Sequence, residues 1–205
     1  MKAKQTLPII LLLVFALTRV PGLMPPNFSA AYGLLFCAGV YFSGAIAWWL
    51  PLSVMLGTDL LLNWYYGAAL LQPHLLASLL AYASLILLGR QFSRRSSWLS
   101  LLAGGVSGAI LFYLVTNTLA WFFNPFANPE YTKTLGGWIT ALTKGTAGYP
   151  QTWEFFRNTL LSGGLFTGLF AGAMKLSESR ETSEEETTAP DEEPEEAAEA
   201  DEAKA

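Results

Sequence analysis

Cysteine and histidine, the commonest zinc ligands, are scarce in this chain of 205 residues. It has one cysteine, Cys37, so it can form no intrachain disulfide. It has one histidine, His74, so a Cys/His set with the spacing of a zinc site is missing. A site built from Asp59, His74 and Glu154 can be imagined across helices, but nothing in their spacing specifies one. The sequence therefore predicts no metal site.

Motifs of common enzyme classes are missing as well. There is no Walker-type phosphate loop and no Gly-x-Ser-x-Gly elbow, which excludes an ATPase and gives no support to a serine hydrolase. Ser162 is followed by two glycines but has no base in a recognisable relation to it, so packing is the better interpretation. We expect a protein that is not an enzyme and uses no cofactor, and an intramembrane enzyme is the third-ranked interpretation.

Charge divides the chain into two parts. Residues 176–205 hold thirteen of the 16 acidic residues in a Glu-, Ala- and Thr-rich run that cannot bury enough apolar surface to fold. Residues 1–175 hold ten Lys and Arg against three acids, and the chain as a whole is 52% hydrophobic with mean hydropathy +0.36. This pattern is typical of a polytopic membrane protein. We predict an all-α transmembrane domain at 1–175, a disordered acidic tail at 176–205 and no nucleic-acid partner.

Apolar runs predict six transmembrane helices. The first, at 7–17, is shorter than the ~20 residues of an ordinary span and could be a signal peptide. We favour a retained helix, because no clean cleavage site follows and Arg19 can snorkel to the interface. The other five are expected at about 28–42, 45–62, 73–88, 98–123 and 152–174.

Positive charge predicts the orientation of these helices. A cytoplasmic N-terminus places seven Lys and Arg inside and three outside, which agrees with the positive-inside rule. The expected location is the inner (cytoplasmic) membrane of a bacterium, with both termini cytoplasmic. The seven are Lys2, Lys4, Arg90, Arg94, Arg95, Lys175 and Arg180, and the three are Arg19, Lys133 and Lys144.

Polar residues gather at the predicted external end and form the candidate substrate-binding set. Ionisable groups in a membrane cost roughly 2.5–3.5 kcal/mol each and usually face a cavity or a bundle interior. We expect Arg157 to face Asn117 and the third helix, with Asp59 or Glu154 offsetting its charge. The alternative is that Glu154 and Arg157 pair with each other and only anchor the helix. The full set is Asp59, Asn63, Asn117, Trp121, Glu154, Arg157 and Asn158.

Two further features concern packing and access. Gly164, Gly168 and Gly172 form a small-residue stripe of the kind that packs helices together. In the long loop at 124–151, apolar residues recur at helical spacing from Leu135 to Leu142. This predicts a short amphipathic helix, which is either a lid over a pocket or an interfacial anchor.

Several motifs resemble one bacterial family. They are Arg19-Val-Pro-Gly-Leu-Met-Pro-Pro-Asn-Phe-Ser, Pro51 with Asp59, Thr116-Asn117 with Trp121, Tyr149-Pro150, and Phe155-Phe156-Arg157-Asn158-Thr159-Leu160. The chain resembles a domain-of-unknown-function family described as membrane transport proteins, over about residues 6–175. That family is similar to the substrate-binding S components of energy-coupling-factor (ECF) vitamin transporters.

The resemblance implies six helices, an outward-facing pocket capped by loops, and partnership with a coupling subunit and ATPases. One departure is that the first helix has Ala16 but no Ala-x-x-x-Ala pair, with which S components dock the coupling subunit. Our leading interpretation is a membrane protein that binds a small solute for uptake, of the vitamin or cofactor-precursor class. The alternative is a non-transporting membrane scaffold whose polar residues only stabilise helix packing.

Overall fold

The structure is a computed structural model, which describes the backbone of residues 3–188 and the side chains of residues 10–180. This part of the chain is all-α, as predicted, with no strand in it. It contains seven helices: α1 (Ala3–Thr18), α2 (Ala31–Tyr41), α3 (Ile46–Tyr65), α4 (His74–Gly89), α5 (Trp98–Phe123), α6 (Leu135–Thr143) and α7 (Thr152–Thr188).

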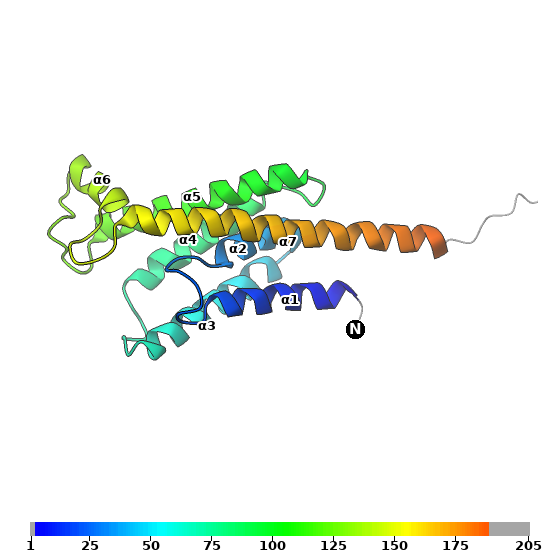
Figure 1. Ribbon diagram of the computed structural model, residues 1–205, viewed down its shortest axis with the longest axis horizontal. Coiled ribbons are helices and arrows are strands. Elements are labelled where there is room, and N and C mark those ends of the chain that lie inside the picture. The colour runs from blue at the N-terminus through cyan, green and yellow to red at the C-terminus, as the bar shows by residue number, and fades with distance from the viewer. Residues whose placement is uncertain (1–2, 189–205) are drawn as a thin grey trace, which may run out of the picture.

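The helices other than α6 run back and forth along the long axis of the molecule (Figure 1). The short α6 and the loops around it lie at one end, and the N-terminus lies toward the other end. The loops that follow α1 and α3 turn at the α6 end, whereas the loop that joins α4 to α5 turns at the opposite end. Six helices therefore alternate in direction.

Helix α2 is the centre of the bundle. All eleven of its residues are buried, and it packs against α1, α3, α4, α5 and α7. A helix that is apolar on every side is stable only when protein or lipid covers every side. Its small residues allow close contact, because a methyl group on Gly39 would overlap the backbone of α4 and one on Gly33 would lie 2.7 Å from the backbone nitrogen of Thr167 in α7.

The beginning of α2 lies inside the protein, so its free backbone N–H groups need partners there. The Ala30 N–H donates to Thr18 Oγ1 at 3.0 Å, and the Ala31 N–H donates to Ser29 Oγ at 3.2 Å. Both hydroxyl-bearing side chains are buried. A short helix can therefore begin inside the protein without leaving these two N–H donors unpaired.

Three helices are long and apolar enough to cross a membrane: Ile46–Tyr65, Trp98–Phe123 and the Thr152–Arg180 part of α7. The predicted bounds of the fifth span agree with α5, and the predicted short helix in the long loop is α6. Helices α2 and α4, with 11 and 16 residues, are shorter than an ordinary span. By length and composition, the structure supports three spans where the sequence predicts six.

The predicted domain boundary at residue 176 falls inside a helix. Helix α7 continues past it to Thr188, so 176–188 is helical where we expected disorder. The rest of the predicted tail, 189–205, lies outside the described residues.

The predicted glycine stripe on α7 faces the beginning of α5. Trp98 Nε1 donates to the Gly168 carbonyl at 3.0 Å, and Gly172 lies beside the same indole. Tighter contacts between the two helices occur at Gly163, where a methyl group would lie 2.7 Å from the Ala109 side chain, and at Gly105 on α5, where one would overlap Thr167 Oγ1. Small residues do pack α7 against α5, but the closest approach is one position away from the predicted stripe.

Candidate ligand-binding cavity

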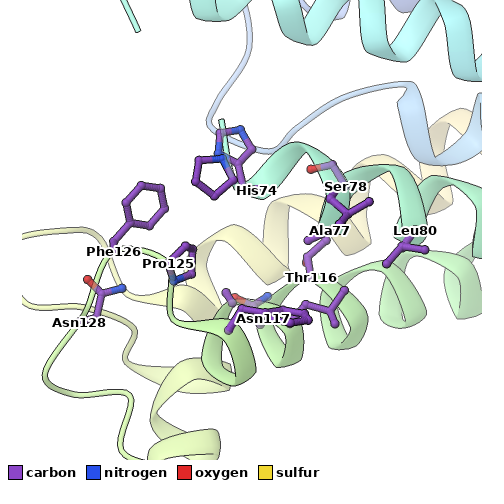
Figure 2. Close-up of a pocket in the computed structure, with 14 residues that line it drawn as sticks. His74, Ala77, Ser78, Leu80, Thr116, Asn117, Pro125, Phe126 and Asn128 are labelled. Atoms are coloured by element: carbon purple, nitrogen blue, oxygen red, sulfur yellow. The ribbon is translucent and has the colours of Figure 1, made fainter. Parts of the chain in front are cut away.

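A cavity of about 480 Å³ lies between α4, α5 and the segment that follows α5 (Figure 2). Ligand pockets for small molecules typically measure about 300–1,000 Å³, so this volume suits one. It is lined by Pro73, His74, Leu76, Ala77, Ser78, Leu80, Thr116, Asn117, Leu119, Ala120, Phe123, Pro125, Phe126 and Asn128.

The lining is mostly apolar and includes no Lys, Arg, Asp or Glu. A few hydrogen-bonding side chains stand among the apolar ones. Asn117 Nδ2 donates to the Tyr113 carbonyl at 2.9 Å, which leaves its Oδ1 as an acceptor. Within residues 10–180, the side chains of His74, Ser78 and Asn128 have no hydrogen-bond partner. The arrangement can therefore hold an apolar body and bond to a small number of polar atoms.

Asn124 shapes the mouth of this cavity. It ends α5 in the left-handed conformation, with φ 42°, which asparagine tolerates better than most residues. Its side chain accepts the Asn128 N–H at 2.8 Å and donates to the Asn128 carbonyl at 2.9 Å. These two bonds fold the four residues after Asn124 into a compact turn that places Phe126 and Asn128 opposite His74 (Figure 2).

Of the seven predicted site residues, Asn117 alone lines this cavity. Three others bond to the backbone of a loop. Asn63 Nδ2 donates to the Leu70 carbonyl at 3.0 Å, Trp121 Nε1 to the Thr132 carbonyl at 2.7 Å, and Asn158 Nδ2 to the Pro26 carbonyl at 2.9 Å. Each of these side chains fastens one loop at the α6 end of the bundle.

Glu154 also has a local partner. Its Oε1 accepts the N–H of Gln151 at 3.3 Å, three residues earlier in the chain. A carboxylate in the first turn of a helix interacts favourably with the helix dipole. Glu154 therefore stabilises the beginning of α7, and it does not pair with Arg157.

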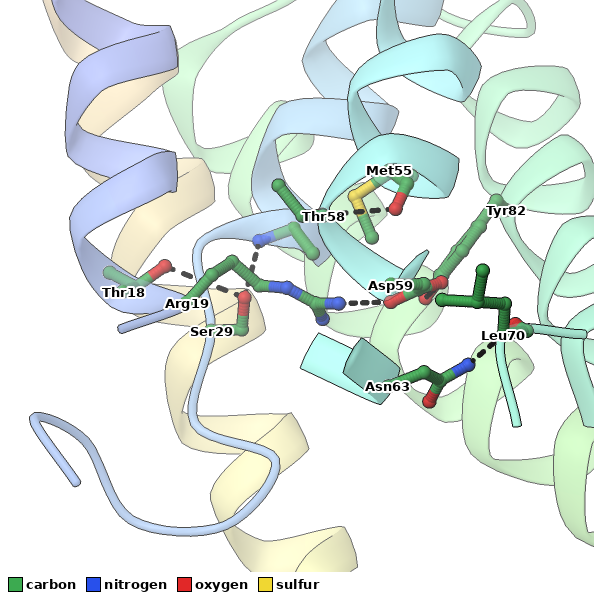
Figure 3. A network of polar contacts seen from close by, with 10 residues as sticks. Thr18, Arg19, Ser29, Met55, Thr58, Asp59, Asn63, Leu70 and Tyr82 are labelled. Atoms are coloured by element: carbon green, nitrogen blue, oxygen red, sulfur yellow. Dashed lines mark hydrogen bonds and ion pairs between the residues drawn. The ribbon is translucent and has the colours of Figure 1, made fainter. Parts of the chain in front are cut away.

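The predicted pairing of Arg157 with Asp59 is wrong. Asp59 forms its ion pair with Arg19, and these side chains are 15% and 17% exposed (Figure 3). Asp59 Oδ2 also accepts the Tyr82 hydroxyl at 3.1 Å. Arg157 is exposed and lies over the Trp153 ring at 5.8 Å. The physical reason is that the loop after α1 places Arg19 beside Asp59, whereas Arg157 projects from the outer face of α7.

Five of the cavity residues that we did not predict come from α4. His74 and Ser78 lie one turn apart on one helix face, as do Thr116 and Ala120 on α5. This spacing was visible in the sequence, but nothing indicated that the two faces meet. The imagined metal set of Asp59, His74 and Glu154 does not assemble, because within the described residues no three His, Cys, Asp or Glu could hold a metal ion.

The amphipathic helix α6 is fixed to the neighbouring helix. The Tyr113 hydroxyl donates to the Leu142 carbonyl, and Trp138 Nε1 donates to Thr118 Oγ1 at 3.0 Å. None of the α6 residues lines the cavity. These contacts favour the anchor over the lid among the two predicted roles, and the segment 125–128 is the part of the long loop that borders the cavity.

The model of a family of unknown function (DUF6580) matches residues 1–186, which is most of the chain. Neither the curated proteins nor the solved structures include a significant match.

Proposed function

We propose that this chain, which belongs to the DUF6580 family, is a six-pass membrane protein that binds a small molecule in the cavity between α4 and α5 and takes part in its uptake. The observation that carries the binding function is the cavity itself. It has the volume of a ligand pocket and apolar walls, and it contains polar side chains without partners in the described part of the chain.

The long helices support the membrane location. Helix α5 has 26 residues, which at a rise of about 1.5 Å per residue is about 39 Å, more than the ~30 Å of a bilayer core. Large apolar side chains also lie exposed on the outer faces of the bundle, for example Trp49 with 73% of its surface. Lipid chains would cover such side chains without the cost that water imposes.

The alternating direction of the helices supports six passes. Helices α1, α2 and α4 are short, but non-helical backbone is tolerated at membrane depth where protein surrounds it. The bonds from Ala30 to Thr18 and from Ala31 to Ser29 meet this condition at the beginning of α2. A short enclosed helix can therefore complete a pass together with the loop that leads into it.

Charge supports a cytoplasmic location for the end opposite α6. The loop between α4 and α5 carries Arg90, Arg94 and Arg95. Arg94 donates to the Tyr41 carbonyl at the end of α2, and Lys175 Nζ donates to the Arg94 carbonyl at 3.2 Å. This basic end lies near the cytoplasm in the proposed orientation, with both chain termini on that side.

A role in uptake is the extension of this proposal. In the same orientation, the mouth formed by His74, Phe126 and Asn128 lies toward the external side, because the beginning of α4 and the segment after α5 are at the α6 end (Figure 1). The resemblance to S components supports a substrate-binding part of a transporter, for a vitamin or cofactor precursor, with a coupling subunit and ATPases as partners.

One observation favours the alternative of a membrane scaffold. Asn63, Trp121 and Asn158 donate hydrogen bonds to loop carbonyls. Most of the amide and indole groups that the sequence predicts to bind a ligand are therefore already bonded to the protein's own backbone. A scaffold would need these bonds and no ligand.

Native mass spectrometry of the full chain separates the two functions. We expect the purified wild-type protein to retain a small molecule that is released on unfolding. Ala120→Trp fills the cavity, and this variant should lose that mass. Leu114→Trp is the matched control, because Leu114 lies on the same helix, is exposed and does not line the cavity. Absence of a bound molecule, or equal retention by Ala120→Trp, would overturn the binding function.

A further inference from the structure

We infer that the cavity takes a neutral amphiphile, with an apolar chain along α4 and α5 and an uncharged hydrogen-bonding head at His74 and Asn128, and that this ligand enters from the lipid side. The inference rests on the proposed binding function and assigns its ligand class. Hydroxyl, ester and carbonyl heads belong to this class, whereas carboxylates, phosphates, sulfonates and ammonium groups do not.

The scarcity of ionisable side chains in the lining determines the head group. None of the 14 lining residues is Lys, Arg, Asp or Glu, and the one ionisable side chain among them, His74, is exposed at the mouth. A charged group held deeper in the cavity would be desolvated without an ion-pair partner, which is strongly unfavourable in an apolar site. Two charged residues that follow in the same loop have other partners. Lys133 donates to the Trp121 and Phe122 carbonyls, and Glu130 Oε1 accepts the Ala147 N–H at 3.0 Å.

The positions of the polar side chains determine how the ligand would lie in the cavity. His74 and Asn128 stand toward one end of the cavity, on either side of Phe126, and Leu80 lies at the other end (Figure 2). Ser78 and Asn117 lie between these ends. A ligand with its head at His74 and Asn128 would place its chain against Leu80 and other apolar lining residues, among them Leu119 and Ala120.

The exposed side chains of the lining indicate how the ligand would enter the cavity. Leu76, Leu80, Phe123 and Phe126 line the cavity, and all four are more than half exposed, with Leu76 and Phe123 at 66%. The cavity is therefore open on the side of the bundle, where a membrane protein meets lipid chains. A molecule that partitions into the bilayer reaches this opening directly, whereas a strongly hydrated solute would have to leave water first.

Unpaired polar groups distinguish this cavity from an ordinary lipid-covered groove. In the described part of the chain, the side chains of His74, Ser78 and Asn128 have no hydrogen-bond partner, and Asn117 keeps a free acceptor. Lipid tails cannot satisfy them. A head with both donor and acceptor atoms, such as a glycerol ester, can bond to the imidazole of His74 and the amide of Asn128.

The test uses three photoactivatable probes with the same alkyl chain and diazirine: a monoacylglycerol, an alkylsulfonate and an alkyltrimethylammonium. The full chain is placed in phosphatidylcholine nanodiscs, and labelled residues are mapped by mass spectrometry. We expect the monoacylglycerol to label α4 and α5 at the cavity at least about tenfold more than the charged probes, which corresponds to about 1.4 kcal/mol. Unlabelled monoacylglycerol should compete.

Three variants make the result specific. Ala120→Trp should abolish the preferred labelling, and Leu114→Trp should leave it unchanged. His74→Leu should reduce the preference for the neutral probe, because it removes a head-group partner but keeps an apolar wall. Equal labelling by the three probes, or preference for a charged probe, would overturn the neutral-amphiphile inference.

The inference and the proposed function fail in different ways. A bound water-soluble molecule that is lost in Ala120→Trp and is not displaced by monoacylglycerol would keep the binding function and overturn the ligand class. No retained molecule together with equal labelling by all three probes would overturn both.

Discussion

Arg19 and Asp59 show, at the scale of single residues, how a charge is accommodated in an apolar bundle. They lie 40 residues apart in the chain and join the segment after α1 to α3. Tyr82 on α4 donates to the second carboxylate oxygen at 3.1 Å. Breaking a buried ion pair by removing one partner is costly because the other charge remains without compensation. This network therefore holds three elements together.

Asp59→Asn should destabilise the protein by about 3 kcal/mol, at the lower end of the range for buried pairs because Arg19 keeps some contact with solvent. Thermal unfolding in detergent would measure this as a lower Tm. The double variant Arg19→Met/Asp59→Leu should recover most of the loss, since neither charge is then left unpaired.

Arg157→Gln is the matched control for this experiment. Arg157 is exposed on α7, and its cation–π contact with Trp153 is worth about 0.5–1 kcal/mol at an exposed site. Its Tm should change little. A loss of stability as large as that of Asp59→Asn would mean that Arg157 is the cation whose charge the acidic side chains offset, as the sequence predicts.

At the scale of elements, the fold depends on how closely α2 approaches its neighbours. Gly39 on α2 and Gly89 on α4 meet backbone to backbone, and a methyl group on either would overlap the other helix. Gly33 makes a similar contact with α7. Small residues give membrane helices this close approach because lipid provides little hydrophobic drive for their association. This crossing therefore helps to set the position of α4, and with it one wall of the cavity.

Gly39→Ala should separate α2 from α4 and cost about 1–3 kcal/mol, the usual cost of overfilling a packed core. Chemical unfolding in detergent micelles, followed by circular dichroism, would measure the difference.

Gly57→Ala is the comparison, because nothing lies within 4 Å of the methyl group that it would add in α3. That change should stabilise the protein by about 0.5–1 kcal/mol through helix propensity alone. Equal effects of the two substitutions would show that the crossing at Gly39 is not tight.

At the scale of the whole molecule, the two ends of the bundle differ in chemistry. The α6 end carries the long loops, the Arg19 and Asp59 network and the mouth of the cavity (Figure 1, Figure 2, Figure 3). The other end carries Arg90, Arg94 and Arg95. In a membrane, such an asymmetry sets the orientation, because loops rich in Lys and Arg stay in the cytoplasm.

Cysteine labelling tests this orientation in intact cells. Ala147→Cys, in the loop between α6 and α7, should react with a membrane-impermeant maleimide added outside. Ser93→Cys, in the loop between α4 and α5, should react only after permeabilisation. Native Cys37 is 5% exposed, so the wild-type chain should give little background. The reverse pattern would invert the topology and place the cavity mouth toward the cytoplasm.

The sequence by itself determined the all-α class, the bounds of α5, the beginning of α7 and the presence of α6, because these depend on local signals. Apolar runs and nearby caps are such signals: Ser97 Oγ accepts the Ser100 N–H, and Thr134 Oγ1 accepts the Gly137 N–H. The family membership also follows from the sequence.

Only the tertiary structure decided which side chains meet. Spacing along a helix places Glu154, Arg157 and Asn158 on neighbouring positions, but it does not say whether that face turns inward or outward. It also cannot reveal that Arg19 reaches Asp59, or that the faces of His74 and Asn117 enclose one cavity. These outcomes depend on crossing points such as Gly39 with Gly89, where contacts between distant segments fix the rotation and separation of each helix.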